Sequence, residues 1–251
     1  MENEKEIQLC KKRIMELATT SYYKEYPTYT DFLTLNEQSV FQSMVRDLPA
    51  VSYTMWGGNA ISERKMICFS NSEIDKDAFP ISVLKIQVVH AKFAEKLTHR
   101  DYLGAVLHLG IDRSKIGDIM FDNKDAYIFV EDCMKDYIMA SLEKVKHTNI
   151  RCEEVETDIA FEQNYQEIVG TVSSVRLDAV IATAFHSSRS RLLSMISGGK
   201  VFVNGRLIMS NSYRLNEGDI VSVRGVGKFL YDKEQDMTKK GKVKILLKKY
   251  T

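Results

Sequence analysis

Residues 175–224 carry the pattern that most restricts the fold of this chain. Two helical stripes come first, each with apolar residues at a spacing of three or four: Leu177, Ile181, Ala184 and Phe185, then Leu192, Met195 and Ile196. Gly198-Gly199 ends the second stripe, and Asn204-Gly205 then separates Lys200–Val203 from Arg206–Met209. Because Asn-Gly readily adopts the positive φ values of a two-residue turn, this segment predicts a hairpin. A further strand is expected over Ile220–Arg224, which completes a small αα-β unit.

The second predicted helix begins with Arg189 and Arg191, and either Ser187 or Ser188 can cap it. A helix N-terminus offers free backbone N–H groups and a positive dipole end, and a guanidinium group can bind a phosphate through two hydrogen bonds at once. These residue types therefore indicate contact with a phosphate backbone rather than readout of bases. The predicted RNA-binding set is Arg176, Ser188, Arg189, Arg191, Lys200, Asn204, Arg206, Arg214, Arg224 and Lys228, where the later basic residues extend the surface if they face the same way.

The overall charge of +1 conceals a separation of the two signs along the chain. Residues 171–251 contain 15 Lys or Arg and 6 Asp or Glu, a net charge of +9, whereas residues 1–170 contain 20 and 28, a net charge of −8. No Lys or Arg lies between Arg151 and Arg176, and this change in composition predicts a domain boundary. Such asymmetry indicates that the basic part binds a polyanion.

The middle of the chain shows a β-α-β-β-α-β order, which is typical of ferredoxin-like domains, including RNA-recognition motifs. The predicted elements are a strand at Ile81–Val89, a helix opened by Thr98 and Asp101 as a capping box, strands at Asp118–Phe121 and Ala126–Val130, a helix over Glu131–Val145 and a strand at Ile150–Val155. The aromatic signature of RNA-recognition motifs is missing, and Tyr127 and Phe129 are expected to include at least one core residue.

The first segment, about residues 1–75, reads as a smaller α/β domain. Ile7, Cys10, Ile14 and Leu17 predict one helix, and Asn36 to Leu48 predicts a second. Two apolar runs, Val51–Trp56 and Met66–Phe69, are separated by GGNAISERK and indicate two strands. The expected fold class is thus α+β, with an N-terminal α/β domain over 1–75, an RRM-like domain over 76–165 and an αα-β domain over 171–251.

The motifs RLD, SRSR, GGKVFVNG and EGD of the last domain resemble the S4 RNA-binding domain, although Leu192-Leu193 stands where S4 domains often have Ala and a polar or basic residue. GGNAISERK (57–65), LTHRDYLGAVLHLGIDRSKIGDI (97–119) and SVRGVGKF (222–229) are similar to stretches of the YlmH group of bacterial S4 proteins. That resemblance implies an RRM-like middle domain and a C-terminal S4 domain. It also implies binding to rRNA and tRNA on the large ribosomal subunit, in quality control of stalled nascent chains.

The expected function is therefore that of a non-catalytic RNA-binding factor. An RNA-modifying enzyme that uses S4 for targeting is the alternative, because RLD also occurs in pseudouridine synthases, where the Asp is the nucleophile; a structural Asp178 is favoured here. A protein–protein adaptor that acts through the acidic part is a third possibility. His99, Arg100, Arg113 and Lys115 are candidates for secondary RNA contacts.

Neither a cofactor nor a metal is expected, since no glycine-rich phosphate loop and no Cys/His cluster occurs in the sequence. The N-terminus lacks the apolar region of a signal peptide, and no stretch is long enough to span a membrane. We therefore expect a cytoplasmic protein that makes no membrane contact and is monomeric off the ribosome. The tail alternates Val243, Ile245 and Leu247 with lysines, which predicts an edge strand whose lysine face meets phosphates.

Overall fold

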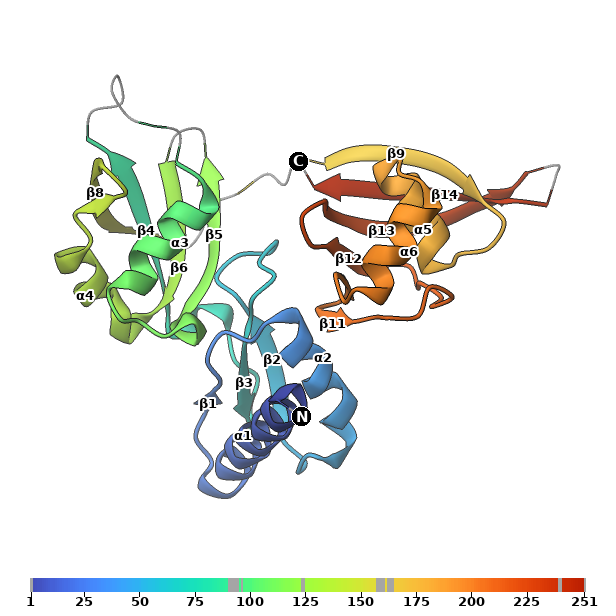
Figure 1. The fold of residues 1–251 in the computed structure, drawn as a ribbon. Helices are drawn as coiled ribbons and strands as arrows, with labels where there is room; N and C mark the ends of the chain where they lie inside the picture. Colours follow the sequence, from blue (N-terminus) through green and yellow to red (C-terminus); the bar gives the residue numbers. More distant parts are fainter. Residues whose placement is uncertain are drawn as a thin grey trace. The chain divides into compact units, whose positions relative to one another are not determined.

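The computed structural model describes residues 2–89, 95, 97–122, 125–156, 161, 165–238 and 241–250, with only the backbone described at 2, 3 and 189 (Figure 1). The chain separates into two compact units, Met1–Phe161 and Glu162–Thr251. The mixture of helices and antiparallel sheets confirms the predicted α+β class. The division into three domains at 75/76 and 165/171 stays a prediction.

The first part of unit 1 is a three-stranded antiparallel sheet covered by two helices. Its elements are α1 (Glu2–Lys24), β1 (Thr28–Tyr29), α2 (Leu35–Met44), the 3-10 turn Val45–Asp47, β2 (Ser52–Trp56) and β3 (Met66–Ser70), with strand order β1-β3-β2. Thr34 starts α2 in a capping box with Glu37, whose carboxylate accepts from the Thr34 backbone N at 2.7 Å. Ile14, Phe41 and Phe69 meet in the core beneath the helices. The two predicted helices and two predicted strands are confirmed, whereas β1 was not foreseen.

The second part of unit 1 is a five-stranded sheet of order β5-β6-β4-β8-β7. Its elements are the 3-10 turn Lys76–Ala78, β4 (Ile81–Val88), α3 (His99–His108), the 3-10 turn Arg113–Lys115, β5 (Ile116–Asp122), β6 (Asp125–Glu131), α4 (Asp132–Ser141), β7 (Lys144–Val145) and β8 (Thr148–Val155). The predicted order is confirmed, and so is the capping box of Thr98 and Asp101. The predicted turn residues Asn123 and Lys124 lie outside the described part of the chain.

The helix predicted over Glu131–Val145 is too long. Helix α4 ends at Ser141, and Val145 instead pairs with Thr148 in a tight hairpin between β7 and β8. Lys146 occupies the turn with a φ of 53°. A glycine at this position would have indicated a turn with positive φ, whereas a lysine does not. The helical spacing of apolar residues continues as far as Val145 because this residue, although it lies in β7, is buried in the same core as the inner face of α4.

Both faces of the middle sheet are buried. Leu84, Ile128 and the other even-numbered positions of β4 and β6 pack with α3 and α4, whereas Tyr127 and Phe129 pack with Phe32 and Met66 of the first part. Gly58, at a φ of 88°, allows this approach, since a Cβ there would lie 2.4 Å from the Phe129 ring. RNA-recognition motifs stack bases on aromatics of an open sheet face. In this chain the corresponding aromatics are core residues, as expected for at least one of them.

Unit 2 is a six-stranded antiparallel sheet with two helices, in the order β11-β10-β12-β13-β14-β9. Its elements are β9 (Tyr165–Val172), α5 (Leu177–Phe185), α6 (Arg189–Ser197), β10 (Val201–Val203), β11 (Arg206–Leu207), β12 (Ile220–Val223), β13 (Gly227–Met237) and β14 (Val243–Tyr250). Asn204 and Gly205 take φ values of 48° and 74° between β10 and β11, as the predicted two-residue turn requires.

The tail strand is not an edge strand, which corrects the sequence-based prediction. β14 lies between β13 and β9, and it pairs with β9 over the full length of both strands. The strand β9 was not predicted, because its sequence falls in the acidic stretch that resembled a solvated connector. Ile245 and Leu247 fill the core as the alternation indicated, and the predicted Lys239 and Lys240 lie outside the described residues.

Candidate RNA-binding surface

The start of helix α6 carries the central part of the predicted surface. Ser188 occupies the N-cap position with an extended backbone (φ −67°, ψ 143°), but its hydroxyl accepts no backbone N–H of the helix and lies 3.3 Å from the Ser190 hydroxyl instead. The backbone of Arg189 begins the helix, and the Arg191 side chain is exposed to solvent. The end of α6 that a phosphate would approach therefore combines a helix dipole with at least one solvent-exposed guanidinium group.

Arg176 and Asp178 form a pair at the start of α5. The guanidinium Nε and Nη2 of Arg176 donate to the two carboxylate oxygens of Asp178 at 3.1 and 3.2 Å, and the Ala179 backbone N donates to the same buried carboxylate. This geometry supports the structural role that was favoured for Asp178. Arg176 also forms a backbone bridge with Arg214, so the two arginines are neighbours at this corner.

The hairpin after α6 holds three of the predicted residues. The Lys200 and Arg206 side chains are exposed. Asn204 serves the fold, since its amide donates to Asp219 at 2.8 Å and accepts from the Ile220 backbone N at 2.9 Å. An RNA contact through the Asn204 side chain would have to replace these bonds.

Arg224 and Lys228 lie on the other face of the sheet from α5 and α6. Val203, Phe229 and their alternating neighbours enter the core beneath the helices, so the residues between them face the opposite way. The Arg224 guanidinium stands 4.6 Å from the centre of the Phe202 ring, and the Lys228 ammonium stands 4.5 Å from that of Tyr250. The structure thus divides the predicted residues between two faces instead of joining them on one.

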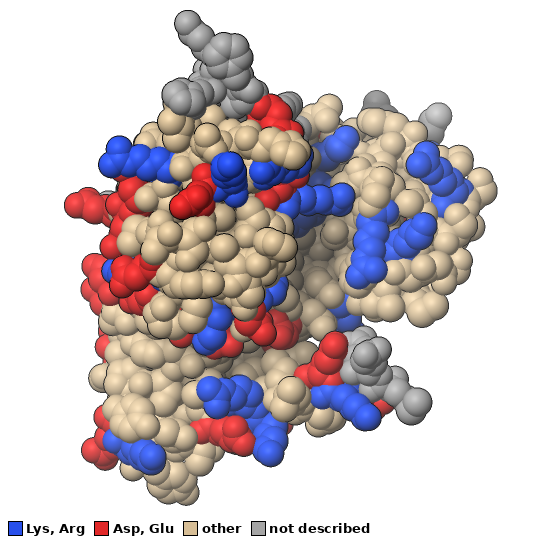
Figure 2. Space-filling model, turned by 60° about the vertical axis from the view of Figure 1, so that its left-hand side comes forward, with Lys and Arg blue, Asp and Glu red and all other residues tan. Residues whose placement is uncertain are grey.

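Positive charge predominates on the face of unit 2 that Figure 2 shows. Blue Lys and Arg side chains are spread over the lobe at the upper right, which shows no red, whereas the surface of unit 1 mixes both colours. This distribution agrees with the net charge of +9 over residues 171–251. Clustered positive charge without interleaved acids favours binding of a polyanion.

The second set of predicted contacts, in unit 1, is largely used by the fold. The Arg113 guanidinium donates to the carbonyls of Ile116 and Gly117, and Lys115 forms ion pairs with Asp31 at 2.9 Å and Glu131 at 2.6 Å. His99 and Arg100 are exposed at the start of α3. Desolvation and the charge of Arg113 lower the pKa of His99, which disfavours a charged ring. Of this set, Arg100 is the exposed cation best placed to meet RNA.

Arg64 is a residue whose role the sequence did not reveal. Its Nε donates to the Ile116 carbonyl at 3.0 Å and its Nη2 to the Phe32 carbonyl at 2.6 Å, so it joins the two parts of unit 1. Burial lowers the pKa of Arg64, and burial together with Arg64 lowers that of Arg113 to about 10. Both arginines therefore bond to backbone carbonyls at the start of β5, and for Arg64 the available signal was its position directly after GGNAISE.

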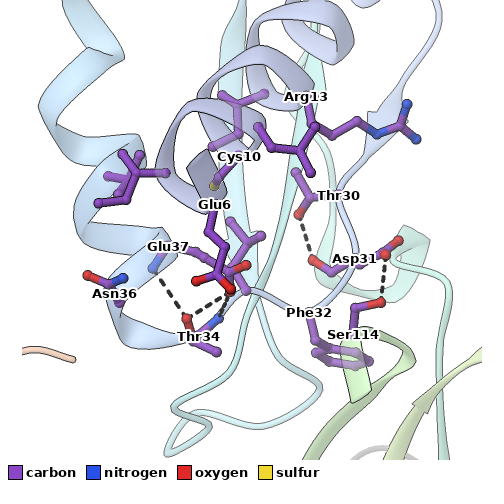
Figure 3. A pocket seen from close by; sticks show the side chains of 15 residues that line it. Glu6, Cys10, Arg13, Thr30, Asp31, Phe32, Thr34, Asn36, Glu37 and Ser114 are labelled. Carbon is purple, nitrogen blue, oxygen red and sulfur yellow. Dashed lines mark hydrogen bonds between the residues drawn. The ribbon is translucent and has the colours of Figure 1, made fainter. Parts of the chain in front are cut away.

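A pocket of about 590 Å³ opens between α1, α2 and the segment 30–34 (Figure 3). Two of its acidic groups already have partners, since Glu37 bonds to Thr34 and Asp31 accepts from the Ser114 hydroxyl at 2.8 Å. Burial and the nearby Glu37 raise the pKa of the Cys10 thiol to about 11, so the thiol is protonated and a poor nucleophile at neutral pH. The pocket is thus a cavity with an apolar wall, and Glu37, Asp31 and Cys10 give it no activated catalytic group.

None of the helices in the described part of the chain is both long and apolar enough to cross a membrane. The described residues also contain no group of three or more His, Cys, Asp or Glu side chains arranged to hold a metal ion.

Comparison with known families agrees with this geometry. The model of the S4 domain matches residues 175–221, and a model described as "Putative RNA-binding domain in YlmH" matches residues 75–159. The fold and the matched regions define an RNA-binding protein of the S4-domain class. Ribosome-associated protein quality control protein P2 of Bacillus subtilis (strain 168) is 32% identical over 221 residues, which cover 86% of this chain and 84% of that protein. The chain belongs to the YlmH family, as the resemblance in its motifs predicted.

A solved structure, the cell division protein ylmH from Streptococcus pneumoniae, has 22% sequence identity and a TM-score of 0.49. The match covers 60% of this chain and 91% of that one.

Proposed function

We propose that this protein is a non-catalytic RNA-binding factor that docks on structured rRNA or tRNA of the large ribosomal subunit. Its role would be in the quality control of stalled nascent chains, in the cytoplasm and without a cofactor, and the chain would be monomeric off the ribosome. The start of α6, with Arg189 and Arg191, is the centre of the proposed docking surface.

The observation that carries the proposal is the exposed, basic start of α6 inside a region that matches the S4 domain. Phosphates there would meet a helix dipole and guanidinium groups, and Lys200 and Arg206 of the hairpin after α6 offer further exposed charges. The name of the Bacillus subtilis relative supports the ribosomal setting. Docking of this kind recognises the shape and charge of folded RNA, and it releases condensed counterions.

The test compares two double variants of the full chain in binding to purified large ribosomal subunits and to tRNA. Arg189→Ala/Arg191→Ala removes two charges at the proposed surface. Lys5→Ala/Lys24→Ala removes two charges from exposed positions of α1, outside the predicted RNA-binding sets, and serves as the control. We expect the arginine variant to bind at least about tenfold more weakly and its dependence on salt to fall by up to about two counterions.

Equal affinity of the two double variants would contradict the proposed surface. The question of catalysis has its own measurement, which is mass mapping of rRNA and tRNA from cells that lack the protein. A modification that is lost there and restored by the purified protein would replace the proposal with the RNA-modifying alternative.

A further inference from the structure

Six residues form a line across the six strands of unit 2, at right angles to the strands. The strand register pairs Leu207 with Phe202, Phe202 with Ser222, Ser222 with Lys228, and Tyr250 with Tyr165. The Lys228 ammonium overlies the Tyr250 ring and closes the line. We call these residues the transverse row: Leu207, Phe202, Ser222, Lys228, Tyr250 and Tyr165.

The transverse row lies on the face of the sheet opposite α5 and α6. Side chains alternate between the faces of a strand. Val201 and Val203 flank Phe202 and are buried under the helices, as are Phe229 beside Lys228 and Ile168 in the strand of Tyr165. Figure 1 shows both helices on one side of this sheet, so within unit 2 the row belongs to the side without helices.

Aromatic rings along this line lie beside cations. The Arg224 guanidinium covers the Phe202 ring at 4.6 Å, and the Tyr165 and Tyr250 rings meet edge to face at 5.1 Å. The Tyr165 side chain is 37% exposed, Arg224 is exposed, and Phe202 and Tyr250 are partly exposed. Rings beside guanidinium or ammonium groups are the elements with which proteins bind single-stranded nucleic acids.

The cation in the middle of the row is kept at an energetic cost. Burial lowers the pKa of Lys228 to about 8, so its charged form is less stable there than in water. A cation held at such a position despite its burial is suited to a phosphate, which would restore the stability of the charged form.

We propose that the transverse row is a second RNA site, which binds unpaired nucleotides by stacking bases on the Arg224 guanidinium above Phe202 and on the Tyr165–Tyr250 pair while Lys228 contacts a phosphate. This inference rests on the proposed RNA-binding function and adds a second kind of target to it. The start of α6 suits the backbone of folded RNA, whereas the row offers ring faces, which paired bases inside a helix cannot reach. One protein would thus bind a structured element and an adjacent single-stranded segment.

The experiment measures binding of the full chain to two RNA probes by fluorescence anisotropy. One probe is a ten-nucleotide single-stranded RNA that carries one 2-aminopurine, and the other is a hairpin RNA of tRNA-stem type. Tyr165→Leu/Phe202→Leu removes ring faces from the row but keeps apolar side chains. Tyr23→Leu, at an exposed tyrosine of α1, is the matched control, and Arg191→Ala reports on the surface at α6.

We expect Tyr165→Leu/Phe202→Leu to bind the single strand at least about tenfold more weakly, because each stacked base contributes about this much or more. The variant should also lose the quenching of 2-aminopurine fluorescence on binding, and its affinity for the hairpin should stay within about twofold. Tyr23→Leu should match the unmodified protein with both probes, whereas Arg191→Ala should mainly weaken binding to the hairpin.

Unchanged binding and quenching by the row variant would overturn the inference, as would a protein that binds the hairpin but not the single strand; the proposed function would survive both results. Binding of neither probe would instead count against the proposed function itself. If the row variant melts at a clearly lower temperature, Arg224→Gln, at an exposed side chain, replaces it with the same expectations. A row variant that loses only a protein partner of the ribosome would also overturn the assignment to RNA.

Discussion

Lys228 shows at the scale of a single residue how the proposed second RNA site would oppose stability. Its ammonium lies over the Tyr250 ring at 4.5 Å, and burial holds its pKa at about 8, against 10.5 for a free lysine. A lowered lysine pKa means that folding favours the neutral form. Below pH 8 the side chain is charged in both the folded and the unfolded chain, and the full cost of burying that charge is present.

We therefore expect Lys228→Met to raise the free energy of unfolding at pH 7, by up to about 3 kcal/mol, since each pKa unit corresponds to about 1.4 kcal/mol. Between about pH 8 and 10.5 the unfolded chain binds more protons at this position than the folded one, so the original protein gains stability and the difference shrinks. Urea unfolding of both proteins at pH 7 and pH 9.5 measures this. A difference that stays constant with pH would contradict the assignment to the buried charge.

How far individual residues could be predicted depends on whether their role is local. Asn204 could be assigned to a turn because its positive φ is required by the two-residue loop itself. The role of Lys115 could not be predicted, because its partners Asp31 and Glu131 lie far from it in the sequence and meet it only through folding. An exposed contact to RNA and an internal ion pair use the same residue types.

At the scale of elements, the close packing of β9 against α5 depends on a single glycine, Gly170. A Cβ at Gly170 would lie 2.2 Å from the Cγ2 methyl of Thr183, closer than real side chains approach. The Thr183 hydroxyl donates to the Ala179 carbonyl at 3.0 Å, which fixes the position of the methyl group. The contact explains why a glycine stands within a strand that is paired along its whole length.

Gly170→Ala should lower the free energy of unfolding by about 1–3 kcal/mol, as is usual when a packed contact is overfilled. Thr183→Ser removes the methyl but keeps the hydroxyl, so Gly170→Ala in that background should have a much smaller effect. Chemical denaturation of the two single variants and the double variant gives the coupling between the sites. Additive effects would show that the methyl group is not the cause.

Local sequence signals predicted most elements of the fold. The errors occurred where the structure depends on pairing between strands that are far apart in the sequence. The capping box at Thr98 and the apolar alternation at Ile245 and Leu247 could be read directly from the sequence. The neighbours of β14 could not, because strand register and order depend on β9, which is about 75 residues earlier and carries Glu167 on the face away from the core. The transverse row could not be predicted for the same reason, because its residues are brought side by side only by the register of the six strands.

At the scale of the whole molecule, the boundary of the basic unit matters as much as its charge. A fragment that begins at Thr171, where the charge changes sign, would lack most of β9 and leave β14 unpaired along one side. The compact unit begins at Glu162 and therefore includes Glu167 with the basic strands. The acidic unit 1 would then limit non-specific attraction to RNA in the full chain.

The fragment 162–251 should accordingly bind bulk RNA more tightly than the full chain, by about three- to tenfold at low salt, and with less preference for ribosomal RNA. The expectation follows from removal of net negative charge, and the difference should decrease as salt is raised. Competition binding with total cellular RNA measures it, once circular dichroism has shown that the fragment is folded. Equal preference for ribosomal RNA in fragment and full chain would contradict a role of unit 1 in selectivity.

The central place of β14 in its sheet also sets the order in which unit 2 can form during synthesis. β14 is the partner of β9, and β9 pairs with no other strand in the described sheet. Until β14 has been made and has left the ribosome, β9 and β13 both lack the strand that joins them. The sheet of unit 2 is therefore completed by the strand that is made last among its six.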